Sequence, residues 1–461
     1  MEVQFQNFRC FCDTGKVPIR PITILVGENS SGKTSFLAGL NHIVALLDDS
    51  PVDLNTAPFQ LGSFKDIVFR SSAGAGFRSF TYRCFSENNV VGSWKFEDTA
   101  GAPELAESSV ESGDGEFLSV DREGIKVQLA LPIETRDALR ALGVVLKKKK
   151  SKDLYRIDLR GAQHSRLFRR VMPQAFRNVF NRISRITFLI DDWISNLIEE
   201  AAEDNTQRDF RFKPRSIFVE FERRLRHMTR SNQYTRAKFR AFAPIRETPQ
   251  RVYLHEGGVQ SVHDSSGVHT PTKLLKLSQV SQEHWYSFKS DLEQFGRDSG
   301  LFEGIVPHPL VKRSQYPFEI RIKSKHGKTS NLRDVGYGVS QILPLLVEFL
   351  DPASNSGFLI QQPEVHLHPK AQAEFGTLMA NLANKNKNFI VETHSDFILE
   401  RIGLEIKKGR LDKDKVVILF FEPQQPEVKV HPIYLAADGS PNTAPPSYRK
   451  FFLEEYRRLW G

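Results

Sequence analysis

The residues with the clearest chemistry lie at positions 27–34, where the sequence reads Gly-Glu-Asn-Ser-Ser-Gly-Lys-Thr. The glycines of this GxxxxGKT spacing permit a tight turn in which backbone N–H groups converge on a phosphate. In such a loop Lys33 reaches the β- and γ-phosphates, and the hydroxyl of Thr34 is a ligand for Mg²⁺. The other phosphate-binding positions are Asn29, Ser30, Ser31, Gly32 and Ser35. The spacing therefore predicts a site for ATP and Mg²⁺.

Two elements must position this loop. Residues 19–26 are largely apolar and predict a buried strand that leads into the loop. Residues 35–47 predict a helix, whose positive N-terminal end points at the same anion. At the start of the chain, apolar residues alternate over positions 3–8, which predicts a half-buried strand.

A second set of candidate residues follows apolar segments in the other half of the chain. The strand-like run 358–360 leads into QQPEVHLHP at 361–369. Residues 388–391 predict another strand, which is followed by ETHS at 392–395. Ahead of both, a segment at 334–341 that contains Gly and Ser opens an apolar helix, which extends to about residue 350.

These motifs occur in an order that is typical of one group of proteins. The chain resembles the ATPase head shared by SMC, RecF and OLD proteins, and the resemblance covers roughly residues 1–70 and 330–430. It implies an α/β fold, namely an ABC-type P-loop ATPase head with a mixed sheet and an inserted helical lobe. It also implies a homo-oligomer in which two copies meet head to head and share their ATP sites.

The resemblance assigns several roles residue by residue. Gly336, Gly338 and Ser340 match the signature helix start, which caps the γ-phosphate bound to the opposite subunit. Small residues at a helix N-terminus also leave N–H groups open to an anion. Gln60 falls where the family has a glutamine that senses Mg²⁺, and His394 matches the switch histidine that hydrogen-bonds the γ-phosphate.

The sequence departs from the family at two positions. The family has an acid at position 361, which orients Mg²⁺ and its water, and often a glutamate at 362, which activates the attacking water; here both are glutamine. Gln361 stays the expected metal-site position, and Gln362, Glu364 and His394 the catalytic ones. Because an amide cannot act as a carboxylate base, hydrolysis is expected to be slow or absent unless Glu364 substitutes. Either the chain is a natural weak ATPase that works as an ATP-gated clamp, or a carboxylate has been changed to trap the ATP-bound state.

Two residue pairs have an alternative interpretation as metal ligands. His366 and His368 belong to the HLHP element, a regular part of this family's loop, and Cys10 and Cys12 offer too few ligands for zinc. We therefore expect no metal site besides that for Mg²⁺.

The motifs divide the chain into three parts. Residues 1–70 form the N-terminal part of the head, 71–330 an inserted β and helical lobe, and 331–461 the C-terminal part, which ends in an amphipathic helix from 447. Within the insert, 77–85, 92–96 and 154–159 predict strands and 101–115 predicts a flexible loop. Helices are predicted over 164–182, 187–203 and 214–241.

Composition limits where the protein works and what it contacts. The chain has 461 residues, three cysteines and no apolar run of the ~18 residues needed to cross a membrane. We therefore expect a cytoplasmic protein that does not contact a membrane. The formal net charge of +9, with basic clusters between residues 147 and 226, favours nucleic acid or an acidic protein as a partner.

The resemblance narrows the function to two main hypotheses. The motifs PExHLHP and THSDF are similar to those of ATPases in bacterial antiphage defence systems of the PARIS, Septu and OLD types. This implies an ATPase subunit that controls a separate effector, usually a nuclease, and is triggered by DNA or a viral protein. The alternative is a RecF-like DNA-repair ATPase that clamps DNA on ATP binding. The early hairpin and the unusual signature argue against the nucleotide-binding subunit of a transporter.

Overall fold

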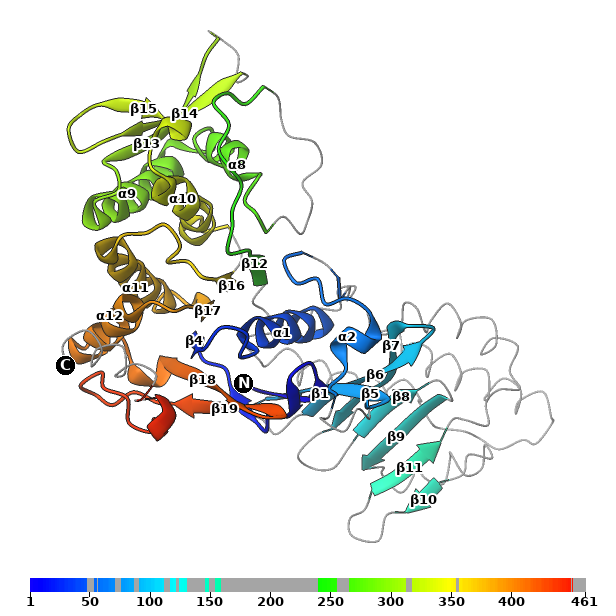
Figure 1. Ribbon diagram of the computed structural model, residues 1–461. Coiled ribbons are helices and arrows are strands. Elements are labelled where there is room, and N and C mark those ends of the chain that lie inside the picture. Colours follow the sequence, from blue (N-terminus) through cyan, green and yellow to red (C-terminus); the bar gives the residue numbers. More distant parts are fainter. Residues whose placement is uncertain are drawn as a thin grey trace, which may run out of the picture. The chain divides into compact units, whose positions relative to one another are not determined.

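The computed structural model, shown in Figure 1, describes most of the head and part of the insert. The described residues are 1–47, 54–55, 57–70, 76–86, 91–111, 117–121, 124–130, 146–148, 154–158, 239–254, 265–311, 317–353, 356–448 and 450. The chain forms two compact units. The first contains Met1–Lys16, His42–Asp53 and Gly62–Arg236, and the second contains Val17–Asn41, Leu54–Leu61 and Ala237–Gly461.

The first unit is built on an antiparallel sheet with the strand order β10-β11-β9-β8-β7-β6-β5-β1-β2. Its strands are β1 (Glu2–Phe8), β2 (Phe11–Asp13), β5 (Ser79–Phe85), β6 (Val91–Thr99), β7 (Ala102–Glu111), β8 (Phe117–Asp121), β9 (Gly124–Ala130), β10 (Leu146–Lys148) and β11 (Leu154–Asp158). A short helix, α2 (Phe64–Ile67), belongs to the same unit. Rings of Phe5, Phe8, Phe80 and Tyr82 pack together on one face, as the alternation of apolar residues in β1 predicts.

The prediction of a flexible loop at 101–115 was wrong for residues 102–111, and residues 112–115 lie outside the described part of the chain. Residues 102–111 form strand β7, which pairs with β6 and β8. The segment is rich in Gly, Ala, Ser and Glu, which are poor strand formers, but a strand is stabilised mainly by the neighbours with which it pairs.

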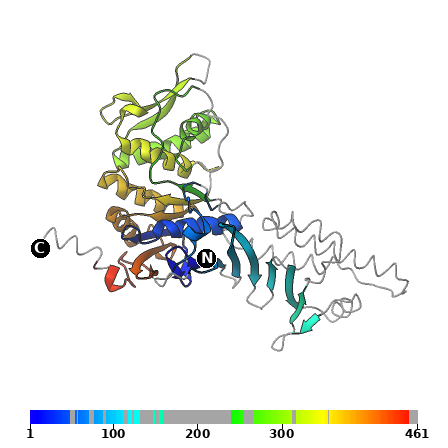
Figure 2. The ribbon, with the colours of Figure 1, turned by 45° about the vertical axis from the view of Figure 1, so that its right-hand side comes forward.

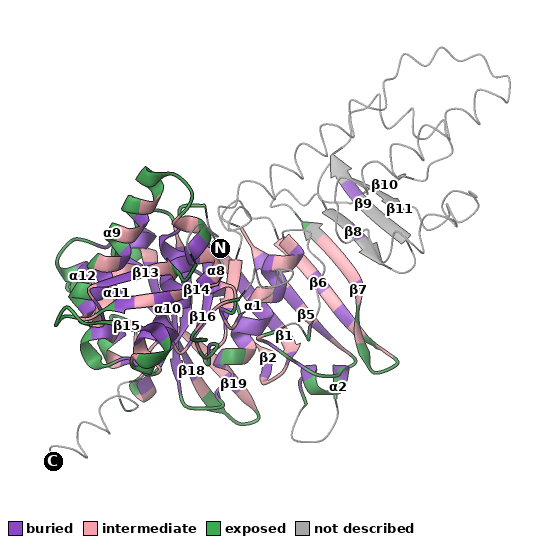
Figure 3. Ribbon diagram, turned by 90° about the horizontal axis from the view of Figure 1, so that it is seen from above, coloured by how far each residue is buried: buried purple, intermediate pink, exposed green. Residues whose placement is uncertain are grey.

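The second unit contains a mixed sheet with the order β12-β16-β17-β4-β18-β19. The strands are β12 (Phe239–Phe242), β16 (Gly357–Gln361), β17 (Asn388–Glu392), β4 (Ile22–Gly27), β18 (Val416–Gln424) and β19 (Glu427–Ile433). The first five are parallel, and β19 is antiparallel to β18. Every residue of β4, β16 and β17 is buried, and buried residues fill the middle of this unit in Figure 3. The predicted strands at 19–26, 358–360 and 388–391 thus form the centre of the sheet.

Helices and a small antiparallel sheet complete the second unit. The helices are α8 (Thr270–Leu277), α9 (Gln282–Ser299), α10 (Tyr337–Leu350), α11 (Pro369–Ala383) and α12 (Asp396–Lys407), with 3₁₀ turns at Leu332–Asp334 and Lys413–Lys415. Helix α1 (Lys33–Leu47) begins in this unit. The small sheet has the order β13 (Gly304–Pro309), β14 (Phe318–Lys323) and β15 (Thr329–Asn331). The two-residue strand β3 (Val17–Pro18) is not part of this small sheet. Apolar side chains of α8 to α12 share one core with β4, β16, β17 and β18.

Several predictions fall wholly or partly outside the described part of the chain. The helices expected over 164–182 and 187–203 lie outside it, as does the tail from residue 451. The helix expected over 214–241 lies outside it up to residue 238; its last residues belong instead to β12, which pairs with β16. Among the helices described, none is both long and apolar enough to cross a membrane.

Candidate functional site

The GxxxxGKT segment forms a loop between β4 and α1 that only glycine permits at two points. At Gly27, φ is +146°, and an added Cβ would lie 2.6 Å from the carbonyl oxygen of Phe421. At Gly32, φ is +90°, a left-handed conformation that favours glycine. Helix α1 begins at Lys33, directly after the loop. The loop therefore has the strand before it and the helix after it that phosphate binding requires.

The ammonium group of Lys33 is buried inside this loop. Its Nζ donates to the carbonyl oxygens of Gly27 at 2.9 Å and of Glu28 at 2.6 Å, and the residue is only 3% exposed. Burial lowers the pKa of Lys33, and the charges of Glu392, Glu28 and Glu364 partly offset this effect. The hydroxyl of Ser31 is buried beside it without a hydrogen-bond partner. A buried cation and an unused hydroxyl in one loop fit the phosphates of a nucleotide.

Thr34 makes a contact that the sequence did not indicate. Its Oγ1 donates to the carboxylate of Glu392, with distances of 3.1 Å to Oε1 and 2.9 Å to Oε2. Burial raises the pKa of Glu392, whereas the bond from Thr34 and the charge of Lys33 act in the opposite direction. The only sequence signal was an acid directly before Thr393 and His394 at the end of a strand. The structure thus adds Glu392 to the candidate site.

The two glutamines follow the neighbouring strand. Gln361 ends β16 and is the register partner of Glu392 on β17. Gln362 has a φ of +42°, and its N–H donates to the carbonyl oxygen of Glu392 at 2.8 Å. Non-glycine residues adopt positive φ at a cost that surrounding contacts must offset, and such residues cluster at functional sites.

Glu364 links the loops after β16 and β17. One of its carboxylate oxygens accepts the backbone N–H of His394 at 2.7 Å. Burial raises the pKa of Glu364, while hydrogen bonds and the charge of Arg246 lower it. His394 is exposed, and its pKa is lowered by partial desolvation of the ring and, to a smaller extent, by the charge of Lys33. A neutral imidazole with one N–H donor fits the expected contact with a γ-phosphate.

Arg246 is a second residue whose place the sequence did not reveal. Its side chain is 3% exposed, and Nη2 donates to the carbonyl oxygen of Gln361 at 3.3 Å. Its backbone exchanges hydrogen bonds of 3.0 and 3.3 Å with the side-chain amide of Gln341 in α10. Burial lowers the pKa of Arg246 to about 10, and the negative charge of Glu364 partly offsets this lowering. Arg246 therefore connects the strand end at Gln361 with the signature helix.

The signature segment forms the expected helix start. Gly336 is the exposed N-cap of α10, and the first turn has no acidic residue and no side-chain cap. At Gly338 an added Cβ would lie 2.8 Å from the carbonyl oxygen of His366, so the loop after β16 packs directly on this helix. The ring of Tyr337 lies against that of His366. Ser340 is buried, and its hydroxyl donates to the carbonyl oxygen of Tyr337 at 2.9 Å. In this structure the hydroxyl is therefore hydrogen-bonded within the first turn of α10.

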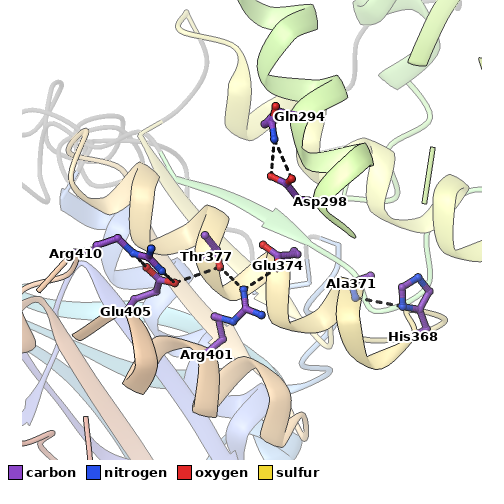
Figure 4. A network of polar contacts seen from close by, with 9 residues as sticks. All are labelled: Gln294, Asp298, His368, Ala371, Glu374, Thr377, Arg401, Glu405 and Arg410. Carbon is purple, nitrogen blue, oxygen red and sulfur yellow. Dashed lines mark hydrogen bonds and ion pairs between the residues drawn. The ribbon is translucent and has the colours of Figure 1, made fainter. Parts of the chain in front are cut away.

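Two further candidates lie apart from these contacts. Gln60 is exposed in the segment before α2, and within the described part of the chain no hydrogen bond joins it to Thr34. His368 is the N-cap of α11, where its Nδ1 accepts the N–H of Ala371 at 3.3 Å (Figure 4). Histidine and cysteine do not gather with acids here: over the residues placed by the structure, no group of three or more such side chains can hold a metal ion.

Helices α11 and α12, which follow the two loops, lie side by side in Figures 1 and 2 and are cross-linked by polar contacts. Figure 4 shows Arg401 donating to Glu374 at 2.7 Å and to Thr377 at 2.8 Å. Arg410 donates twice to the buried Glu405, at 2.6 Å each. Ser395 caps α12 and donates to Gln372 of α11 at 2.6 Å. Of these contacts, only that between Ser395 and Gln372 lies at the starts of both helices, next to the loops that carry Glu364 and His394.

The sheet order, the loop after β4, Glu364 in the loop after β16 and Glu392 at the end of β17 define a P-loop ATP-binding protein with a mixed α/β fold. The family model described as "AAA domain, putative AbiEii toxin, Type IV TA system" matches residues 22–400. This range covers most of the chain, which therefore belongs to that family.

Solved structures with a similar arrangement are SMC head domains. The Smc head of Pyrococcus furiosus, bound to the C-terminal domain of ScpA, has 12% sequence identity and a TM-score of 0.41, with 99% of this chain and 98% of that chain covered. The SMC head domain from Thermotoga maritima has 10% identity and a TM-score of 0.36, with 94% and 98% covered. No curated protein matches the chain.

Proposed function

We propose that this protein binds ATP with Mg²⁺ and that ATP joins two copies head to head. The observation that carries the proposal is the buried Lys33 ammonium, whose acceptors are two carbonyls of its own loop. Phosphate oxygens are stronger acceptors for an ammonium than carbonyls, so ATP gives Lys33 a better partner than it has here. Asn29, Ser30 and Ser35 belong to the same loop and helix start.

The start of α10 supports a shared site. Gly336 and Tyr337 are exposed, and neither a side-chain cap nor an acid neutralises the positive helix end. The γ-phosphate bound by one copy is an anion that suits this end of another copy. ATP then favours the closed pair only through the contacts that it makes with both surfaces.

Hydrolysis is proposed to be slow. Gln361 and Gln362 stand where acids are usual, and neither is a carboxylate base. Glu364 is the carboxylate that we propose as the base in their place, because it accepts the backbone N–H of His394 and is partly buried. Bound Mg²⁺ would supply positive charge to the phosphate oxygens, with Thr34 among its ligands.

We further propose that the closed pair controls a separate effector, usually a nuclease, in an antiphage defence complex triggered by DNA or a viral protein. The description of the family, which names a putative toxin of a type IV toxin–antitoxin system, is compatible with a protein that works with a second component. The alternative is a RecF-like clamp on DNA. It is favoured by the net charge of +9, although most of the basic clusters lie outside the described residues.

Complementation between two variants tests the shared site. Lys33→Ala removes the phosphate-binding cation, and Gly336→Glu places a negative charge at the start of α10. An added Cβ at Gly336 meets nothing within 4 Å, so the substitution fits the fold. Neither variant alone should dimerise with ATP–Mg²⁺. An equimolar mixture should form mixed dimers, because each mixed dimer has one intact P-loop facing one intact α10. A mixture that stays monomeric, or normal dimerisation of Gly336→Glu alone, would contradict the proposal.

A further inference from the structure

We infer that Glu392, and not a residue at position 361, supplies the carboxylate that holds Mg²⁺ beside the P-loop. This inference rests on the proposed binding of ATP. It explains how a chain with glutamine at both usual acidic positions keeps an acidic metal ligand.

The first argument is the position of Glu392 in the sheet. Strand β17 lies between β16 and β4, and Glu392 is the register partner of Gln361 on one side and of Leu25 on the other. Neighbouring strands are about 4.8 Å apart, so position 392 is one strand from the P-loop strand and position 361 is two. An acid at 392 therefore lies closer to the phosphate-binding loop.

The second argument is the contact with Thr34. Both carboxylate oxygens of Glu392 lie close to Thr34 Oγ1, at 3.1 and 2.9 Å. Adjacent oxygen ligands of octahedral Mg²⁺, with bonds of about 2.1 Å, are about 3 Å apart. The threonine hydroxyl and the carboxylate are thus already spaced like two neighbouring ligands of one Mg²⁺. Sites for Mg²⁺ with a nucleotide typically use one or two carboxylates, with phosphates and water as the other ligands, so a larger acidic cluster is not needed.

The third argument is the charge balance around Glu392. The residue is 6% exposed, and in the hydrogen-bond network described here its carboxylate accepts from an uncharged hydroxyl rather than from a cation at contact distance. A buried carboxylate normally has a partner that compensates its charge. Lys33 contributes at longer range but directs its ammonium to Gly27 and Glu28. A divalent cation beside Thr34 would complete the compensation.

Gln361, by contrast, is engaged elsewhere. Its backbone carbonyl oxygen accepts from Arg246, and its side-chain nitrogen is buried without a partner. The side chain of Glu392 thus contacts Thr34 of the P-loop, whereas Gln361 contacts Arg246 through its backbone and has an uncharged side chain.

The test compares ATP affinity in EDTA and in Mg²⁺, with a fluorescent ATP analogue, for the whole chain and three variants. Glu392→Gln removes the charge and keeps the shape, Glu392→Asp keeps the carboxylate, and Glu374→Gln is a matched control on α11, where Glu374 pairs with Arg401. Mn²⁺ in place of Mg²⁺ allows the bound metal to be counted by electron paramagnetic resonance.

The inference predicts that Glu392→Gln keeps the wild-type affinity in EDTA but loses about tenfold or more of the gain from Mg²⁺. Glu392→Asp should recover part of that gain and part of the bound Mn²⁺ signal, and Glu374→Gln should match wild type. An unchanged Mg²⁺ gain in Glu392→Gln, or an equal loss of affinity with and without Mg²⁺, overturns the inference. Absence of ATP binding by wild type in both buffers is a different result, since it overturns the proposed function itself.

Discussion

The carboxylate of Glu364 accepts the backbone N–H of His394 at 2.7 Å, so the loops that follow β16 and β17 are joined. A change in one loop is therefore transmitted to the other. Glu364 is the only acid in the segment QQPEVHLHP and is partly buried. It thus lies next to His394, the histidine expected to sense the γ-phosphate.

Glu364→Gln should abolish the slow ATP hydrolysis that we propose for this protein and leave ATP affinity within about twofold of wild type. The amide oxygen can still accept the N–H of His394, but the side chain can no longer take a proton. Single-turnover hydrolysis of radiolabelled ATP, together with equilibrium binding, measures both quantities. Turnover at the wild-type rate in Glu364→Gln would exclude Glu364 as the base.

Gly338→Ala should destabilise the protein, whereas Gly336→Ala should not. The Cβ at 338 would lie 2.8 Å from the carbonyl oxygen of His366, while that at 336 meets nothing within 4 Å. Overpacking of this kind costs about 1–3 kcal/mol of the free energy of unfolding. Thermal unfolding of the two variants side by side tests the expectation, and equal Tm values would show that the loop after β16 moves away freely.

Gln361→Glu should stabilise the nucleotide-free protein. Nε and Nη1 of Arg246 are buried donors without partners, and so is the side-chain nitrogen of Gln361, whose backbone carbonyl oxygen accepts from Nη2 of the same guanidinium. A carboxylate at 361 replaces a buried donor with an acceptor for Arg246, and a hydrogen bond between charged groups contributes about 1.5–3 kcal/mol. Denaturant unfolding measures the gain. A loss of stability that persists when Arg246 is replaced by methionine would rule out this pairing.

Lys387→Met should stabilise the protein at pH 7, and the advantage should shrink as the pH rises from about 8 towards 10. Burial lowers the pKa of Lys387 to about 8, while its Nζ donates to the carbonyl oxygen of Asp351 at 3.1 Å. Between the folded and unfolded pKa values the unfolded chain binds more protons, so wild-type stability rises with pH in this window. Tm values at pH 7 and 9.5, with exposed Lys328→Met as the control, test the sign. A gap that does not change with pH would contradict it.

The sequence predicted the parts of the site that depend on local pattern. The P-loop was recognised because its glycines, Lys33 and Thr34 are close in the chain and lie between an apolar strand and a helix, and the structure has both elements. The helix that starts at Tyr337 and the strands that end at Gln361 and Glu392 were found from similar short-range signals. The roles assigned to these residues stay predictions.

The contacts that were missed are all long-range. Thr34 and Glu392 are 358 positions apart, and Arg246 and Gln361 are 115 apart, so only the order of strands in the sheet brings them together. The end of the helix expected over 214–241 failed for a similar reason. Phe239 packs over Gly357, where a Cβ would lie 2.7 Å from its ring, and this partner strand cannot be read from residues 214–241.

The central claim is that ATP in the Lys33 loop joins two copies, and the mass of the protein in solution tests it most directly. Mass photometry or light scattering of the whole chain, with and without ATP–Mg²⁺, should show an ATP-dependent shift towards dimers or larger oligomers. Lys33→Ala should weaken this shift, and exposed Lys385→Ala should not. A monomer under every condition, or an oligomer equally stable in Lys33→Ala, would contradict the account.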